Sequence, residues 1–342
     1  MTEQELERSI LKRPHIFILG AGASLATIPN GDKYGKQCPV MNGFVKQAGL
    51  EDILSDVKLS TTSDNLEEIF SELDSRLDCI GVKKRLECAL FEYFKPLVLP
   101  DEPTIYDFLL LSLRSKDYVF SFNWDDLLIQ AYNRVYQISS DLPQVHFLHG
   151  NVNAAFCPHC KIGLKATNKK CFKCGGPLEQ VPLLFPVKNK NYNSHPYIKG
   201  AWDLFLEKLP QASILTIFGY SAPKSDSAAI DAMRQAFSMN GTLIKYYDNI
   251  EIIDIKPREE IYTSWEPFIE TVHDHVQIYS SIHDTLIGEF PRRSVEGYVK
   301  RNYQGWWGES NHQFQGQNNF KEFENFFNIL IERENNGDFN VI

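Results

Sequence analysis

The sequence lacks any apolar run long enough to cross a bilayer, since a membrane helix needs about 20 consecutive apolar residues. Its first residues are acidic and polar, so no secretory signal is expected. Basic residues are also in short supply, because 35 lysines and arginines stand against 44 aspartates and glutamates and give a net charge of −9. This balance disfavours a broad basic face for nucleic acid. We expect a cytoplasmic protein that contacts neither membrane nor nucleic acid directly.

Cysteine is used sparingly, with seven in 342 residues. Four of them form two Cys-x-x-Cys pairs with a short spacer: Cys157, Cys160, Cys171 and Cys174. This spacing is typical of a closed tetrahedral zinc site and favours metal binding in a reducing compartment over a disulfide framework. All four thiolates would be ligands, so we predict a structural Zn²⁺ with no position open for catalysis. His159 lies inside the first pair and is not expected to be a ligand.

A third glycine is missing from the turn that follows the first predicted strand. Residues 15–19 are apolar, and Gly20–Ser24 follow with the pattern Gly-x-Gly. A strand that runs into such a turn and then a helix lets backbone N–H groups approach a phosphate. The dinucleotide fingerprint requires a further glycine where this chain has Leu25, and an acidic residue near residues 39–41. The turn is a candidate phosphate site, with a plain strand–helix turn as the alternative.

Polar side chains follow two further apolar runs, each of which predicts a buried strand. Asn123 and Asp125 come after residues 119–122, and His149 comes after residues 145–148. Parallel strands deliver such side chains to a ligand crevice at their carboxyl ends. An amide, a carboxylate and an imidazole form a candidate site for chemistry through a charged intermediate. The alternatives are helix capping by Asn123 and Asp125 and a structural role for His149.

The later part of the chain alternates apolar runs with helical patterns. Residues 214–218, 250–255 and 276–279 predict strands, residues 202–209 and 228–237 predict helices, and residues 181–187 predict a strand returning to the sheet. This alternation indicates an α/β fold: a Rossmann-like, mostly parallel sheet with helices on both faces, a small zinc-ribbon module and a helical insertion.

The predicted domains divide the chain as follows. Residues 1–152 and 185–282 form the Rossmann-like domain, with a helical insertion at about 41–118, and residues 153–184 form the zinc module. Residues 283–342 form a C-terminal helical and aromatic segment. One helical face of this segment carries Phe320, Phe323, Phe327 and Leu330. This face either folds onto its own domain or makes an oligomer or partner contact.

The motifs together resemble the sirtuin family, in that family's order, over about residues 14–282. The resemblance rests on the glycine turn, Phe122–Asp125, Leu148–Gly150, the four cysteines and Gly219–Ser221. It implies a Rossmann-like domain and a zinc module with NAD between them. It further implies that Asn123 positions the ribose and a water, that Asp125 contacts the carboxamide of nicotinamide, and that His149 is the general base. The resemblance places the rest of the dinucleotide near Gly20, Ala21, Gly22, Ser24, Gly219, Ser221 and Asp254.

The chain also departs from protein-deacylating sirtuins at three places. Residues 29–32 lack the phenylalanine and arginine of the family's Pro-Asp-Phe-Arg segment, and Phe122 replaces a glutamine. Residues 184–187 contain Pro186 where a peptide-pairing strand is expected, and proline cannot donate to such a ladder. These departures resemble the sirtuin-like NAD hydrolases of bacterial anti-phage systems, which convert NAD⁺ to nicotinamide and ADP-ribose.

The resemblance leads to the hypothesis that the protein hydrolyses NAD⁺. In this hypothesis Asn123 holds a water molecule and His149 deprotonates it, because the ordinary pKa of a histidine side chain is close to neutral. Such an enzyme would poison its own cell, so we expect a silent state that is released by homo-oligomer assembly or by a partner. A hexameric DNA-translocase-type ATPase encoded nearby would be one such partner. Two alternatives remain: an NAD-dependent protein-lysine deacylase, and a non-catalytic scaffold that senses NAD or ADP-ribose.

Overall fold

The computed structural model describes residues 3–165, 168–186, 191–223, 226–238, 249–272, 276–306, 308, 310, 313–314 and 319–341. Val187, which belongs to the predicted strand 181–187, lies outside these residues. Within them, no helix is both long and apolar enough to span a membrane.

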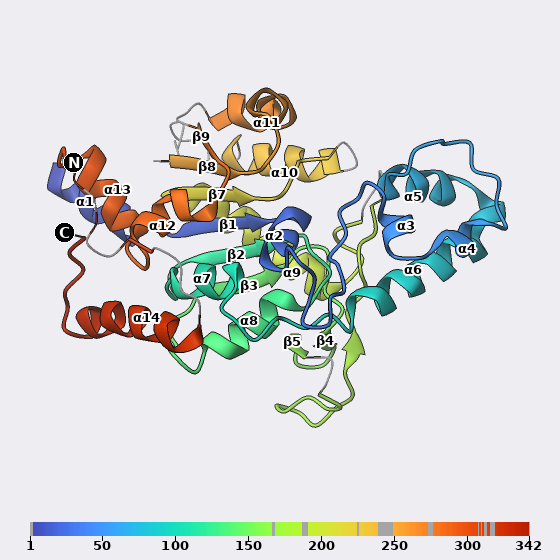
Figure 1. Ribbon diagram of the computed structural model, residues 1–342, viewed down its shortest axis with the longest axis horizontal. Helices are drawn as coiled ribbons and strands as arrows, with labels where there is room; N and C mark the ends of the chain where they lie inside the picture. The colour runs from blue at the N-terminus through green and yellow to red at the C-terminus, as the bar shows by residue number, and fades with distance from the viewer. Residues whose placement is uncertain are drawn as a thin grey trace.

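The centre of the molecule is a six-stranded parallel sheet (Figure 1). Its strands, in spatial order, are β3 (Gln144–Phe147), β2 (Tyr118–Ser121), β1 (His15–Leu19), β7 (Ile214–Phe218), β8 (Asn249–Ile253) and β9 (Val276–Tyr279). The chain leaves β1 toward β2 on one side and returns to β7 on the other, so the strand order reverses between β1 and β7. Ligands of doubly wound sheets bind at this switch point, beyond the carboxyl ends of the strands.

Helices cover both faces of this sheet, which confirms the predicted α/β class. Alternating residues of each strand point to opposite faces: Phe17 and Leu19 enter one hydrophobic cluster, and Ile16 and Ile18 enter the other. The first cluster is covered by α2 (Ala21–Thr27), α7 (Ile105–Leu111) and α8 (Leu127–Val135), and the second by α9 (Pro196–Lys208), α10 (Ser227–Ser238) and α11 (Arg258–Val272). Burial on both faces explains why these strands are nearly continuous apolar runs.

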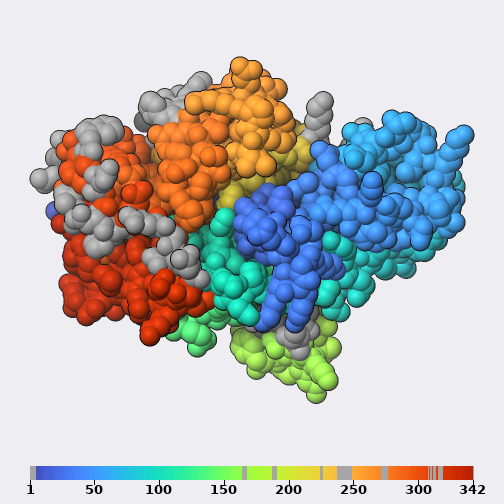
Figure 2. Space-filling model, in the orientation of Figure 1, coloured from blue at the N-terminus to red at the C-terminus, as the bar shows by residue number. Residues whose placement is uncertain are grey.

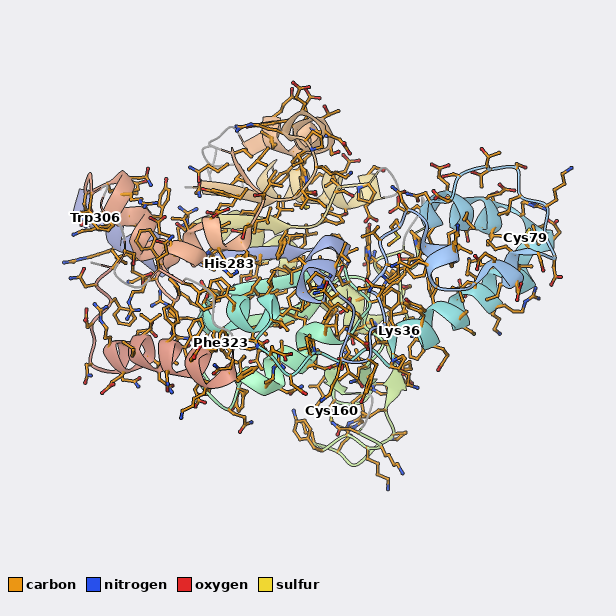
Figure 3. The ribbon with its side chains drawn as sticks, viewed as in Figure 1. Lys36, Cys79, Cys160, His283, Trp306 and Phe323 are labelled. Carbon is orange, nitrogen blue, oxygen red and sulfur yellow. The ribbon has the colours of Figure 1, made fainter. Side chains whose placement is uncertain are left out.

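The predicted helical insertion forms a lobe that projects from one end of the molecule (Figures 1 and 2). The lobe contains α3 (Phe44–Gln47), α4 (Glu51–Leu54), α5 (Leu66–Ser75), a 3₁₀ turn (Leu77–Cys79) and α6 (Ile80–Phe94). In Figure 3, Cys79 marks the far tip of the lobe, and Lys36 marks the side near the body. Helix α7 also falls within residues 41–118, but it packs on α8 and α2 against the sheet. The lobe proper therefore ends before α7.

A second, three-stranded antiparallel sheet holds the predicted zinc module. Its order is β5 (Ile162–Lys165), β4 (Ala154–Cys157) and β6 (Glu179–Gln180). The prediction of a strand at residues 181–187 is wrong over 181–186, which form no strand. Pro182 and Pro186 lack the N–H group that a ladder needs. This segment instead crosses between the module and the main body.

The C-terminal segment folds back onto the main body. It contains α12 (Leu286–Glu289), α13 (Ser294–Asn302) and α14 (Phe320–Asn335), and α13 packs on α1 (Glu3–Lys12). Phe323 and Phe327 of α14 are fully buried, in ring contact with Phe314, which itself contacts Phe108 of α7 (Figure 3). The face with Phe323, Phe327 and Leu330 thus packs on its own chain, so it does not provide an assembly surface.

A buried chain of polar groups joins this C-terminal segment to the middle of the sheet. His15 Nδ1 lies 2.8 Å from Ser294 Oγ, and its Nε2 lies 2.7 Å from Thr216 Oγ1. Thr216 donates to Glu251 at 2.7 Å, and the other oxygen of Glu251 accepts from the backbone N–H of Leu286 at 2.9 Å. Glu251 is fully buried, and this burial raises its pKa from 4.5 to about 7.

Replacing Glu251 with Gln is expected to remove a pH dependence of stability. The folded-state pKa is raised, so the folded protein binds an extra proton between pH 4.5 and about 7. Stability therefore falls as pH rises through that window, by up to ~3 kcal/mol at about 1.4 kcal/mol per pKa unit. The amide oxygen of glutamine can accept from Leu286 N, its nitrogen can donate to Thr216 Oγ1, and the group carries no charge. In urea unfolding, the free energy of unfolding of the variant relative to that of the wild type should be higher at pH 8 than at pH 5.

Glu259→Gln is the matched control, because Glu259 is an exposed carboxylate on α11. It should leave the pH dependence of the free energy of unfolding unchanged. If the free energy of unfolding of Glu251→Gln differed from that of the wild type by the same amount at pH 5 and at pH 8, Glu251 would not be the source of the pH dependence.

Candidate functional site

Two glycine turns meet at the switch point between β1 and β7. Gly22 N donates to Gly219 O at 2.9 Å, and Gly20 N donates to Phe218 O at 3.0 Å. A Cβ atom on Gly219, whose φ is +61°, would lie 2.3 Å from Ala23 N. Only glycine permits this backbone approach. The turns therefore bring Gly20 and Ala21 to the same cleft as Gly219 and Ser221.

The amide of Asn123 is held rigidly above this turn. Its Nδ2 donates to Gly20 O at 2.8 Å and to Ser24 Oγ at 2.9 Å, and lies 3.2 Å from the hydroxyl of Tyr106. A carbonyl oxygen only accepts, so the nitrogen of the amide must face Gly20. The orientation of the Asn123 side chain is thus fixed, with Oδ1 as its remaining acceptor.

Ser24 is the centre of this polar network and is fully buried. Its hydroxyl donates to Asp125 Oδ2 at 2.7 Å and accepts from Asn123. A serine hydroxyl has one proton, so the hydroxyl of Tyr106, 2.8 Å away, must be the donor in its contact with Ser24. All hydrogen-bonding positions of Ser24 Oγ are then occupied. The side chain therefore lies beneath the cleft and orders the groups above it.

Asp125 is also buried and faces this network. Its second oxygen accepts from Leu127 N at 3.1 Å, at the start of α8. Burial raises the pKa of Asp125 to about 6, while the hydrogen bond from Ser24 opposes the rise. The carboxyl group is therefore ionised above about pH 6. Asp125 contacts both Ser24 and the first backbone N–H of α8, so the helix-capping alternative holds for its second oxygen.

His149 follows β3 and is 5% exposed. Its ring meets Phe122 edge to face at 4.7 Å and lies parallel to the ring of Tyr192 at 6.3 Å. Its backbone oxygen accepts from Leu184 N at 2.9 Å. The imidazole thus packs against two aromatic rings, and the backbone of His149 is held by the segment that leaves the zinc module.

One cleft brings most of the predicted site residues together. Seven of them line it: Gly20, Ala21, Asn123, Asp125, His149, Gly219 and Ser221. Gly22 and Ser24 lie behind the lining. Asp254 follows β8 and is also absent from the lining, and its Oδ1 accepts from Lys256 N at 3.0 Å.

The cleft also has walls that sequence reasoning missed. The rings of Phe122 and Tyr220 stack at 4.2 Å with an angle of 4° between them. On the opposite side, the lobe and the segment before it contribute Cys38, Met41, Phe44, Glu67 and Phe94. The cavity volume is about 90 Å³, well below the about 300–1,000 Å³ of sites that enclose whole small molecules. The enclosed part of the cleft is thus smaller than a dinucleotide.

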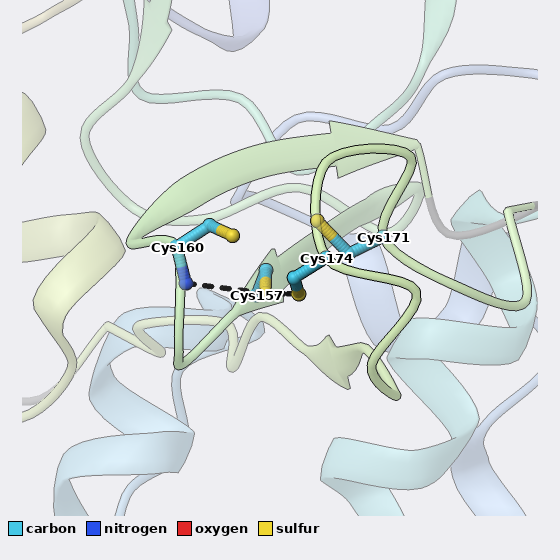
Figure 4. Close-up of side chains that lie close together, drawn as sticks. All are labelled: Cys157, Cys160, Cys171 and Cys174. Carbon is cyan, nitrogen blue, oxygen red and sulfur yellow. Dashed lines mark hydrogen bonds between the residues drawn. The ribbon is translucent and has the colours of Figure 1, made fainter.

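The four predicted zinc ligands converge in the small module (Figure 4). Their sulfur atoms all lie within 4.8 Å of one another, and Cys157 Sγ lies 3.6 Å from Cys174 Sγ. Zn–S bonds of about 2.3 Å in a tetrahedron place sulfur atoms roughly 3.8 Å apart. The cluster therefore fits a structural Zn²⁺, and its four thiolates complete the coordination.

No protein-family model and no curated protein matches the sequence. Solved structures of Sir2 proteins resemble the fold. A Sir2 homologue in complex with NAD shares 15% identity and a TM-score of 0.41, covering 88% of this chain and 95% of that one. A Sir2 homologue in complex with ADP-ribose shares 14% identity and a TM-score of 0.40, covering 90% and 100%. At such low identity and TM-scores, function has to be inferred from the side chains of the cleft.

Tyr106 contacts both Ser24 and Asn123, and it was not identified from the sequence. It lies on α7, which begins with a capping box between Thr104 and Asp107. The local signal explains the helix but not its distant contact, because Tyr106 and Asn123 approach only when α7 packs on α2 and α8. Tyr220 was found in its motif, yet nothing in the sequence indicated that its ring would stack on Phe122.

Proposed function

We propose that this protein is an NAD⁺ hydrolase that releases nicotinamide and ADP-ribose. The observation that carries the proposal is the rigid placement of the Asn123 amide in the same cleft as the His149 imidazole. The glycine turns at Gly20 and Gly219 supply backbone for the pyrophosphate at the switch point. By the resemblance, Ser221 and Asp254 would lie toward the adenosine, and Asp125 would meet the carboxamide of nicotinamide.

The reaction breaks the bond between the ribose C1′ and the nicotinamide nitrogen. The bonding electrons stay with nicotinamide, which leaves as a neutral molecule, and C1′ develops oxocarbenium character. Water attacks C1′, oriented by Asn123 Oδ1, and His149 accepts its proton. The balance is NAD⁺ plus water to nicotinamide, ADP-ribose and one proton. General-base assistance of this kind contributes about 10²–10⁴ in rate.

The narrow cleft supports a resting state with low activity. Its wall from the lobe includes Phe44, Glu67 and Phe94, and its present volume is about 90 Å³. Opening of the lobe would admit NAD⁺, so any contact that shifts the lobe would control turnover. Following the resemblance, we place this hydrolase among NAD-depleting effectors of anti-phage defence. Its release would come from homo-oligomer assembly or from a partner such as a hexameric DNA-translocase-type ATPase.

Nicotinamide formation should not depend on an acylated peptide. Purified protein is incubated with NAD⁺ over a range of protein concentrations, with and without the candidate ATPase, and with and without an acetyl-lysine peptide. We expect nicotinamide and ADP-ribose in equal amounts, and no increase on addition of the peptide.

Two outcomes would contradict the proposal. Nicotinamide released only with the peptide, together with O-acetyl-ADP-ribose, would show a deacylase. Saturable NAD⁺ binding without consumption in every condition would show a sensing scaffold.

A further inference from the structure

The zinc module differs in charge from the rest of the chain. Residues 153–184 contain five lysines and one glutamate, a net charge of +4, whereas the other residues together carry −13. Four thiolates around one Zn²⁺ carry about −2, which still leaves the module positive. The net charge of the whole chain conceals this segregation, so the expectation of no nucleic-acid contact, which rests on that net charge, does not extend to the module.

Four of these lysines gather around the cysteine cluster. Lys161, Lys170 and Lys173 are each next in sequence to one of the four cysteines, whose sulfur atoms lie within 4.8 Å of one another, and Lys169 precedes Lys170. All four lysines are exposed, and none forms an ion pair with a residue that the structure describes. The module projects from the body (Figure 2), so the ammonium groups are accessible to a large ligand.

An aromatic ring lies among these lysines and faces solvent. Phe172 is 81% exposed, and no other large apolar side chain is exposed among the described residues of the module. The turn that carries it is held by two backbone bonds: Gly175 N donates to Cys171 O at 2.8 Å, and Cys171 N donates to Gly176 O at 2.9 Å. Phe172 is therefore presented on a turn of fixed shape. We call the surface formed by Lys161, Lys169, Lys170, Phe172 and Lys173 the knuckle patch.

We propose that the knuckle patch binds single-stranded nucleic acid. Lysine ammonium groups neutralise backbone phosphates, and every base has a π-face that can stack on an aromatic ring. A duplex offers no unpaired base to such a ring, and attachment to a membrane surface requires a continuous apolar face rather than one side chain. The combination of four exposed cations with one exposed ring therefore fits an unpaired strand of DNA or RNA.

The cations and the ring of the knuckle patch predict two separate signatures of binding. Each lysine that neutralises a phosphate of a single strand changes the slope of log K against log salt concentration by about −0.7, so four lysines give a slope of about −3. Stacking on Phe172 is not ionic, so it contributes affinity but no slope. The site lies outside the NAD⁺ cleft, and binding to it does not rest on the proposed function.

The test is fluorescence anisotropy of labelled oligothymidylate and oligouridylate, titrated with the full chain at several salt concentrations and without NAD⁺. The double variant Lys169→Gln/Lys170→Gln should weaken binding about tenfold at low salt and reduce the slope to about −1.4. Phe172→Ala should weaken binding at least about fivefold, the loss of one stacked base, and leave the slope unchanged. Comparison of the two oligomers separates DNA from RNA as the preferred strand.

Two control variants match these changes elsewhere on the surface. Lys84→Gln/Lys321→Gln removes the same charge from exposed positions on α6 and α14, and Leu77→Ala removes an exposed apolar side chain from the lobe. Both should bind like the wild type, and zinc content should be equal in all variants.

Three results would overturn the proposal. The first is the absence of binding to either oligomer at low salt, and the second is unchanged affinity in both variants of the knuckle patch. The third is competition by polyglutamate, anionic vesicles or duplex DNA that equals competition by the unlabelled single strand, because it would show a merely electrostatic surface.

Discussion

Asn123→Ala and His149→Ala are each expected to lower NAD⁺ hydrolysis by about 10²–10⁴-fold, the range for loss of general-base assistance. In the proposed mechanism, Asn123→Ala removes the amide oxygen that orients the attacking water, and His149→Ala removes the group that accepts its proton. Because both residues serve one water attack, their effects should be strongly non-additive. The double variant should be within a few-fold of the slower single variant.

The two substitutions should leave the protein folded. Asn123→Ala removes the donors to Gly20 O and Ser24 Oγ, which costs about 1–3 kcal/mol for the buried groups left unpaired. Far-UV circular dichroism and zinc content would verify the fold, and the exposed Asn328→Ala on α14 serves as the matched control with wild-type activity. Wild-type hydrolysis by both folded variants would place the active site elsewhere.

The arrangement of the main sheet was predictable because its strands are buried on both faces. The run at residues 214–218 coincides with β7, which is buried along its whole length, since a strand without a solvent face needs no polar alternation. The run at residues 276–279 coincides with the edge strand β9, which is partly exposed. The polar residues Asn123 and His149 stood out because each interrupts such a run at its carboxyl end. The four cysteines were predictable for a different reason: a tetrahedral metal site imposes a local spacing that is visible in the sequence.

The remaining features depend on contacts between distant segments. Residues 181–186 are apolar like a strand, yet Pro182 and Pro186 prevent pairing. The aromatic face of α14 gave no indication of its partner, which turned out to be Phe314 of its own chain. Tyr106 likewise looked like one more apolar residue of α7. Periodicity reports that a face is buried, but it carries no information on the surface that buries it.

Removal of zinc is the second change with a large expected effect. The module has three short strands and little apolar interior, and β6 has only two residues. Structural Zn²⁺ contributes about 10–16 kcal/mol of apparent binding free energy in small zinc domains. Cys171→Ser, or a strong chelator on the wild type, should therefore unfold the module and lower the solubility and melting temperature of the whole chain.

The position of the module determines the order of these effects. Leu184 N donates to His149 O, and a Cβ atom on Gly150 would lie 2.2 Å from Pro182 O, so the segment that leaves the module supports the backbone at His149, the proposed base. Loss of stability should appear first, and loss of hydrolysis should follow as this support is released. Cys88→Ser, at an exposed cysteine of α6 outside the cluster, is the control and should bind zinc normally. Folded wild-type protein that contains no zinc by elemental analysis, and whose melting temperature is insensitive to chelator, would contradict a structural metal site.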